Sequence, residues 1–528
     1  MLSRYKYDLI HLGCILILFF SAVFVKIDNL NAPIGRHHEW VTAHTLITAD
    51  IWNENGGPSY SGFSPVYTYK SKANFGRKML GGVTNSEGHH YVSYPPMSFI
   101  TAYYATGLFG GPDVTSIRVL SLLCGLFVAI LLVWVIRNFE RNKEKISWIG
   151  LIAAGTFIFS EGNLWYFGQI YFADILVPIF VLWSIYLFQK VIQLDYSNGK
   201  LVLIGLLLST FFAVYTEWLG LFWTELLGLV LLIYYFRKKL KIYLSGFIAV
   251  FIGSALALIT TLVQYTNIKG WDNLEKVWSL KFAERSGNAM FSDNPEFYLG
   301  SESSYDKLTE HFWDDASGIW IGFLVIGFGL VITLVLKNLR SRIYEPGKLL
   351  NPIILFLSAV LIHYFLFFNF NVLHHFGSVK MVLALILLSA AGVFAIQQIL
   401  DEKIGKISVA VLGVFALLNA GISAVNYQNR FTLKKEDLAL YQSRIQIGKD
   451  ARSDTYIFTD LPNGPEFVYL IKQDVHPAAN EDKVLKIMDS QFIDKAVYYK
   501  SSANELVSKT VFYKDLEGNI IRKYFEFE

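Results

Sequence analysis

Long apolar runs, separated by short clusters of charge, occupy most of this 528-residue chain. Only 17% of its residues are charged, against about 25% in a soluble globular chain. Inside lipid, backbone polar groups must pair within the crossing segment, and a helix of about 20 apolar residues satisfies this need. The chain is therefore predicted to be an integral membrane protein, all-α and polytopic. Its formal net charge of +3 is too small to indicate a nucleic-acid partner.

About eleven apolar runs are long enough to be membrane spans. The first follows Arg4 and Lys6 without a small-residue cleavage site, so we expect an uncleaved helix and not a signal peptide. The expected spans are residues 8–26, 115–136, 146–162, 174–190, 201–216, 219–236, 242–262, 318–336, 349–369, 379–399 and 406–426.

Basic residues gather in every second connection between these spans, and short cytoplasmic loops are enriched in such residues. The N-terminus is therefore expected in the cytoplasm, in the inner (plasma) membrane of a bacterium. The long loops 27–114 and 263–317 and the tail 427–528 are expected outside. Residues 1–426 would form the membrane module. The basic connections hold Arg4 and Lys6; Arg137, Arg141, Lys143 and Lys145; Lys190 and Lys200; Arg237, Lys238, Lys239 and Lys241; Lys337, Arg340, Arg342 and Lys348; and Lys403 and Lys406.

The tail is predicted to form a small α/β domain outside the membrane. Asp454–Leu461 and Lys495–Lys500 have strand patterns, and Asp482–Asp489 has that of a short helix. Val511–Phe527 fits a hairpin that turns at Glu517-Gly518-Asn519. No motif in this tail indicates catalysis.

The first outer loop carries the strongest candidate for a catalytic acid, Glu39. It follows the first span, and residues 41–52 after it form an amphipathic pattern that fits a helix on the membrane surface. A carboxylate at the bilayer boundary is partly desolvated, which favours a general base. An acid that only caps the surface helix is the alternative. The loop closes with Pro95-Pro96 and a short apolar run, Met97–Phe109, which suits an interfacial helix better than a span.

Two further acids, Asp174 and Glu217, stand at the outer ends of later spans. Acids at membrane depth are costly and are usually functional, although an acid at a helix end is in other cases simply solvated. In the predicted topology Glu39, Asp174 and Glu217 all lie at the same outer face.

This arrangement resembles the GT-C glycosyltransferases, in particular the polyprenol-phosphate-dependent branch with the protein O-mannosyltransferases and aminoarabinose transferases. The motifs cover about residues 1–190, and the rest matches by topology. The resemblance implies that Glu39 is the base and Asp174 the second acid. His38 stands where the family has an acid, and Tyr94 stands where relatives often have a lysine for the donor phosphate. Arg36 and Arg118 then become phosphate-binding candidates, as do His374, His375 and Lys380 in a late outer loop, with Glu217 as a further substrate contact.

Histidines cluster around Glu39, and His-Glu clusters can hold zinc or another divalent ion. The adjacent pair His37-His38 is poorly suited to share one metal, so a hydrogen-bonding role is favoured and a divalent metal remains a candidate cofactor.

The resemblance implies transfer of a sugar from a polyprenyl-phosphate donor to a hydroxyl of a lipid, glycan or protein acceptor, with inversion. A transporter or lipid-handling protein is one alternative, which would place ionisable residues inside several spans. A surface-polysaccharide polymerase or ligase is another, which would use the 263–317 loop.

Overall fold

The computed structural model describes residues 2–69, 82–84, 88–140, 145–193, 199–286, 301–316, 346–399, 402–450, 455–462, 464–491, 493–515 and 517–527. The chain divides into two compact units, and each is described by itself. The expected span at residues 318–336 lies outside the described residues.

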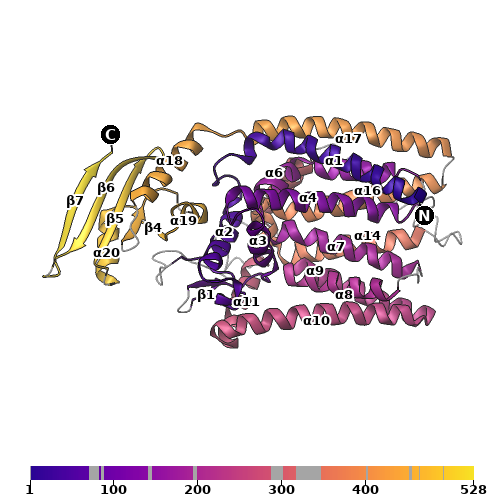
Figure 1. Cartoon of the computed structure of the whole chain (residues 1–528), viewed down its shortest axis with the longest axis horizontal. Helices are drawn as coiled ribbons and strands as arrows, with labels where there is room; N and C mark the ends of the chain where they lie inside the picture. Colours follow the sequence, from indigo (N-terminus) through magenta and orange to yellow (C-terminus); the bar gives the residue numbers. More distant parts are fainter. Residues whose placement is uncertain are drawn as a thin grey trace. The chain divides into compact units, whose positions relative to one another are not determined.

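The first unit, residues 1–30, 118–263 and 282–431, is a helical bundle. Its long helices run side by side in Figure 1. Helix α7 packs against α8, α14 packs against both α9 and α16, and α17 packs against α16 and α5. The helices of this unit, some of which extend past its limits, are α1 (Leu2–Leu30), α4 (Val114–Arg137), α5 (Trp148–Ile158), α6 (Glu161–Gln169), α7 (Ala173–Ile192), α8 (Gly199–Thr216), α9 (Trp218–Lys238), α10 (Lys241–Lys269), α12 (Glu302–Ala316), α14 (Pro346–Leu366), α15 (Phe368–Leu373), η3 (His375–Gly377), α16 (Ser378–Ile399) and α17 (Glu402–Arg430).

Eight helices among the described residues are long and apolar enough to cross a membrane. These candidate spans lie within α1, α4, α7, α8, α9, α10, α16 and α17, and the one in α16 begins in η3. Two shorter apolar helices, Trp148–Ile158 and Pro352–Leu366, lie in the expected spans 146–162 and 349–369. The predicted all-α membrane part is confirmed, while the number of spans remains a prediction.

The second unit comprises residues 31–117, 264–281 and 432–528, so the first outer loop and the tail belong together. Helix α19 of the tail packs against α2 of the loop. The elements of this unit are α2 (Glu39–Glu54), η1 (Pro58–Ser61), β1 (Gly82–Thr84), β2 (His89–Tyr91), α3 (Met97–Gly107), α11 (Trp271–Arg285, which ends in the first unit), α18 (Lys435–Asp450), β3 (Tyr456–Thr459), α19 (Pro465–Ile471), β4 (Val475–Pro477), α20 (Glu481–Ser490), β5 (Lys495–Ser502), β6 (Glu505–Lys514) and β7 (Ile520–Glu526).

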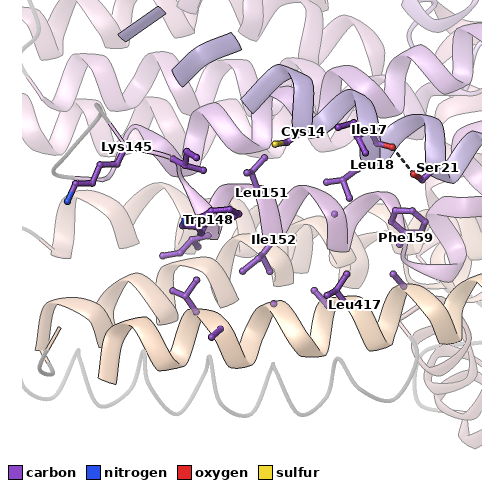
Figure 2. Close-up of a pocket in the computed structure, with 18 of the residues that line it drawn as sticks. Cys14, Ile17, Leu18, Ser21, Lys145, Trp148, Leu151, Ile152, Phe159 and Leu417 are labelled. Carbon is purple, nitrogen blue, oxygen red and sulfur yellow. Dashed lines mark hydrogen bonds between the residues drawn. The ribbon is translucent and has the colours of Figure 1, made fainter. Parts of the chain in front are cut away.

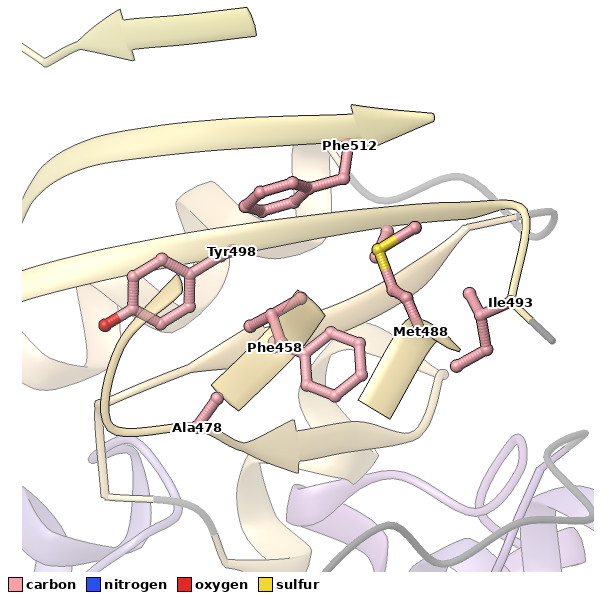
Figure 3. Close-up of a cluster of buried hydrophobic side chains, with 8 residues drawn as sticks. Phe458, Ala478, Met488, Ile493, Tyr498 and Phe512 are labelled. Carbon is pink, nitrogen blue, oxygen red and sulfur yellow. The ribbon is translucent and has the colours of Figure 1, made fainter. Parts of the chain in front are cut away.

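The tail forms a mixed five-stranded sheet in the order β4-β3-β5-β6-β7. Strand β3 pairs in parallel with β4 and β5, and β5, β6 and β7 pair antiparallel. Apolar side chains of α20 and the strands close one core, in which Met488 packs with Phe458 and Phe512 (Figure 3). The small α/β tail predicted from the sequence is therefore present.

Candidate functional site

Four ionisable side chains meet inside the first unit, and we call them the buried quartet: Asp174, Glu217, His363 and Lys380. Asp174 lies in the first turn of α7, and Glu217 joins α8 to α9. His363 lies in the last turn of α14, and Lys380 lies near the start of α16. All four stand at helix ends, so the packing of these helices brings together groups that are far apart in sequence.

Lys380 is the centre of the quartet. Its Nζ lies 2.6 Å from Oδ1 of Asp174 and 2.8 Å from Oε1 of Glu217. The same Glu217 oxygen lies 2.9 Å from Nε2 of His363. All four side chains are fully buried. Since an isolated buried ion is very costly, the ammonium group compensates the two carboxylates, and His363 donates to one of them through the Nε2–H tautomer.

The aromatic ring of Phe370 connects the quartet to the late outer loop. Nζ of Lys380 lies 5.9 Å from the centre of this ring, and the guanidinium of Arg285 lies 5.4 Å from it. The ring of His374 lies 4.6 Å from the same ring. These distances fit cation–π and edge contacts, so Phe370 holds two cations and an imidazole in one neighbourhood.

Two other predicted phosphate-binding residues of this unit make structural contacts. Nη1 of Arg118 donates to the carbonyl of Leu30 at the end of α1, at 2.9 Å. Nη2 of Arg430 lies 3.2 Å from Nδ1 of His375, and Nη1 of Arg430 lies 3.3 Å from Glu161. Arg118 and His375 therefore help to fix helix ends, since terminal carbonyls and buried polar groups need partners.

Glu39, in the second unit, is the first residue of α2, and its side chain is fully buried. Its Oε2 accepts backbone N–H bonds from Gly35 at 2.9 Å and Arg36 at 2.8 Å. Nε of Arg36 lies 3.8 Å from the same oxygen. A carboxylate at a helix N-terminus is favoured by the helix dipole, and these contacts fix its orientation.

His38 precedes Glu39 in a left-handed conformation, with φ at 57°. Such a φ is uncommon outside glycine, although histidine adopts it more readily than most residues. The ring centres of His37 and His38 lie 4.1 Å apart. The two imidazoles beside Glu39 are thus close in space as well as adjacent in sequence.

Tyr94 lies in the segment that closes the first outer loop, and residues of α10 and α11 hold this segment. Its carbonyl accepts a hydrogen bond from the hydroxyl of Tyr265. Nε1 of Trp278 donates to the carbonyl of Val92 at 2.7 Å. Tyr94 itself is buried. Its backbone is therefore fastened from two sides just before the Pro-Pro pair.

His363 was not among the site residues predicted from the sequence. A signal was present, because this histidine lies in an otherwise apolar span, and an ionisable residue inside a span is a functional candidate by default. The structure brings Asp174, Glu217 and Lys380 together and adds His363 as the fourth member. Glu39, the third acid of the expected outer face, belongs to the second unit.

No protein-family model matches the sequence, and no curated protein matches it. Solved structures do match. Archaeal oligosaccharyltransferase AglB from Archaeoglobus fulgidus, in complex with an inhibitory peptide and a dolichol-phosphate, is 11% identical with a TM-score of 0.56, over 98% of this chain and 74% of that chain. The A. fulgidus oligosaccharyltransferase in complex with Zn and sulfate is 11% identical with a TM-score of 0.58, over 92% and 68%.

ArnT from Cupriavidus metallidurans, bound to undecaprenyl phosphate, is 11% identical with a TM-score of 0.50, over 94% of this chain and 93% of that chain. Likenesses at this identity concern the fold, and they extend over nearly the whole chain. The chain has the fold of the GT-C membrane glycosyltransferases.

Proposed function

We propose that this protein is a membrane glycosyltransferase that moves a sugar from a polyprenyl-phosphate donor to an acceptor hydroxyl at the outer membrane face. The observation that carries the proposal is a fold shared with AglB and ArnT, whose structures hold dolichol-phosphate and undecaprenyl phosphate. The membrane is proposed to be a bacterial inner membrane, with the N-terminus in the cytoplasm and the tail outside.

Glu39 is the proposed general base. The acceptor hydroxyl gives its proton to the carboxylate while its oxygen bonds to the anomeric carbon of the sugar. The bond from that carbon to the phosphate oxygen breaks, and polyprenyl phosphate leaves with the electron pair. A single displacement inverts the anomeric configuration. The backbone bonds from Gly35 and Arg36 support this role, because a positioned group contributes more than a mobile one.

The leaving phosphate needs positive charge and little protonation, because it is already a weak base. Arg36 is the proposed partner beside Glu39, and its guanidinium matches the geometry of a phosphate. Arg118, His374 and His375 remain candidates of the first unit for the donor phosphate. Tyr94 and His38 remain candidates for substrate contacts beside Glu39.

Adjacent histidines are poorly suited to share one ion, but the ligand nitrogens of His37 and His38 lie within 4.8 Å of each other beside Glu39, so a divalent ion stays a candidate there. Such an ion would supply further positive charge opposite the donor phosphate. The mechanism above does not depend on it, since Glu39 and Arg36 carry the proton and the charge.

The buried quartet is proposed to position helices and not to bind the donor, because Lys380 already serves two carboxylates. Its place at helix ends also favours the transferase over a transporter, for which ionisable groups are expected at mid-membrane. Asp174 then acts in catalysis through the helix ends that it holds.

The test is transfer by purified protein in lipid from a panel of radiolabelled polyprenyl-phosphate sugars to lipid, glycan and peptide acceptors, with water as the default acceptor. We expect turnover of one donor, with inverted product by NMR. Glu39→Gln keeps the size of the side chain and should abolish turnover, and EDTA reports any need for metal.

Glu54→Gln is the matched control, because Glu54 is an exposed acid at the other end of α2. It should keep full activity. Full activity in Glu39→Gln would overturn the assignment of the base. Tight binding of a donor without turnover, under every acceptor, would favour a transporter.

A further inference from the structure

A long apolar groove runs along the first unit, away from the buried quartet. It has a volume of about 1060 Å³ and lies between α1, α5 and α17. Figure 2 shows Lys145 at one end of it and Phe159 at the other. Helix α5 packs against both α1 and α17 and forms the floor. Leu18, Leu151, Ile152, Gly413 and Leu417 are among its lining residues.

The walls of this groove belong to helices that are otherwise little covered. In the most apolar part of the span at residues 409–430, only 11% of the residues are buried. In the most apolar part of the span at residues 6–30, only 22% of the residues are buried. Both helices therefore leave most of their apolar surface exposed in the described part of the chain. The groove extends along α17 from Lys406 to Ala420, which is about 21 Å at the rise of an α-helix. This exceeds half of the hydrocarbon core, about 15 Å.

The charged end of the groove is opposite to the quartet. Lys380 lies at the start of α16, which ends at Ile399, and α17 then begins at Glu402. Lys406 is therefore at the other end of the bundle from Lys380. A donor whose head lies among the outer helix ends could not place its phosphate at Lys145 and Lys406.

Two exposed cations border this end, Lys145 and Lys406. Glu140, an acid among the described residues that line this end, is half-buried and accepts a hydrogen bond from Ser147 at 2.6 Å. Burial raises the pKa of Glu140 to about 7, so that it carries less than a full negative charge at neutral pH. The groove is apolar, is long enough for a lipid chain, and ends at two positive charges. It is therefore complementary to an anionic lipid.

We propose that this groove binds an anionic phospholipid, with an acyl chain between α1 and α17 and its phosphate at Lys145 and Lys406. The site is separate from the proposed donor site and needs no sugar transfer. Its occupant is a resident lipid of the leaflet at which the basic loops lie.

The test is native mass spectrometry of delipidated protein, titrated with phosphatidylglycerol or phosphatidylcholine. We expect phosphatidylglycerol to be retained preferentially. The double variant Lys145→Ala, Lys406→Ala should lose this preference, by roughly fivefold in retention for each lysine, the effect expected for one basic residue at an anionic surface. Lys241→Ala removes an exposed cation of another basic connection and should change nothing.

A second variant fills the groove without touching its charge. A Cβ at Gly413 meets only Cδ1 of Ile152 at 3.7 Å, an ordinary contact, so Gly413→Leu should fold and exclude the chains of both lipids. Val414→Leu changes the next residue, which is exposed outside the groove, and is the control. An unchanged preference for phosphatidylglycerol in the double lysine variant, or equal retention in both leucine variants, would overturn the proposal. Neither result depends on whether the protein transfers sugar.

Discussion

The ammonium nitrogen of Lys380 lies 2.6 Å from Oδ1 of Asp174, and both side chains are fully buried. Removing one partner of a buried ion pair leaves an uncompensated charge, which costs about 3–5 kcal/mol. We therefore expect Lys380→Met to lower the free energy of unfolding by about that amount, or to prevent folding, as measured by denaturant unfolding in detergent.

The control for this prediction removes the charges together. The triple variant Lys380→Met, Asp174→Asn, Glu217→Gln leaves no ion in the quartet and should recover much of the stability, because replacing all partners of a buried pair is far less costly. Lys241→Met, on an exposed lysine, should be neutral. Equal stability of Lys380→Met and the unchanged protein would show that the quartet is not an ion-pair site.

His363 should contribute less than Lys380. Its Nε2 donates one hydrogen bond to Glu217 at 2.9 Å, and Lys380 still neutralises that carboxylate when the histidine is replaced. We expect His363→Phe to cost about 1–3 kcal/mol, the cost of one unmet buried hydrogen bond. The same change in a Glu217→Leu background, which has no acceptor for His363, should cost less, because the two residues share the bond. Full additivity in this double-mutant cycle would contradict the contact.

Gly35 should be intolerant of any side chain. Its φ of +129° is a conformation that suits glycine, and an added Cβ would lie 3.0 Å from Nη1 of Arg444. Since the N–H of Gly35 donates to Glu39, we expect Gly35→Ala to reduce stability by about 1–3 kcal/mol and to reduce transfer per folded molecule.

Gly56→Ala separates these two effects. Gly56 also has a positive φ, of +83°, but a Cβ there meets open space. This variant should show backbone strain and keep its transfer rate. If both alanine variants transfer equally well per folded molecule, the hydrogen bond from Gly35 to Glu39 does not support transfer.

His89 and His90 predict a loss of stability in mild acid. Burial lowers the pKa of each from 6.5 to about 4, so the folded chain holds them neutral. The unfolded chain gains protons below about pH 6.5, and the folded chain gains them only near 4. Their contribution to the free energy of unfolding is fully present above pH 6.5, and it is lost as the pH falls towards 4. The free energy of unfolding, measured at about pH 7.5 and about pH 5, should be lower at the acid pH. The variant His89→Asn, His90→Asn should show a smaller difference between the two.

Local patterns account for the part of the fold that the sequence predicted. Apolar runs mark the helices α7 and α16, and alternation marks strand β5, because burial in lipid or in a sheet leaves a periodic trace on neighbouring residues. The buried quartet leaves no such trace. Glu217 lies 146 positions from His363 and 163 from Lys380, and only the packing of the whole bundle decides which helix faces meet. Glu39 and Arg36 are close in sequence, and their proximity needed no tertiary information.

The approach of Arg444 to Gly35 has a consequence for biosynthesis. The loop that carries Glu39 is made early, whereas Arg444 and the helix α19 that packs on α2 are made only after the last helices of the bundle. A chain released by the ribosome before that point would hold its helices in the membrane with the support of Glu39 incomplete. Incomplete copies would therefore remain idle, and the proposed activity would begin only when the late part of the chain has folded onto the early one.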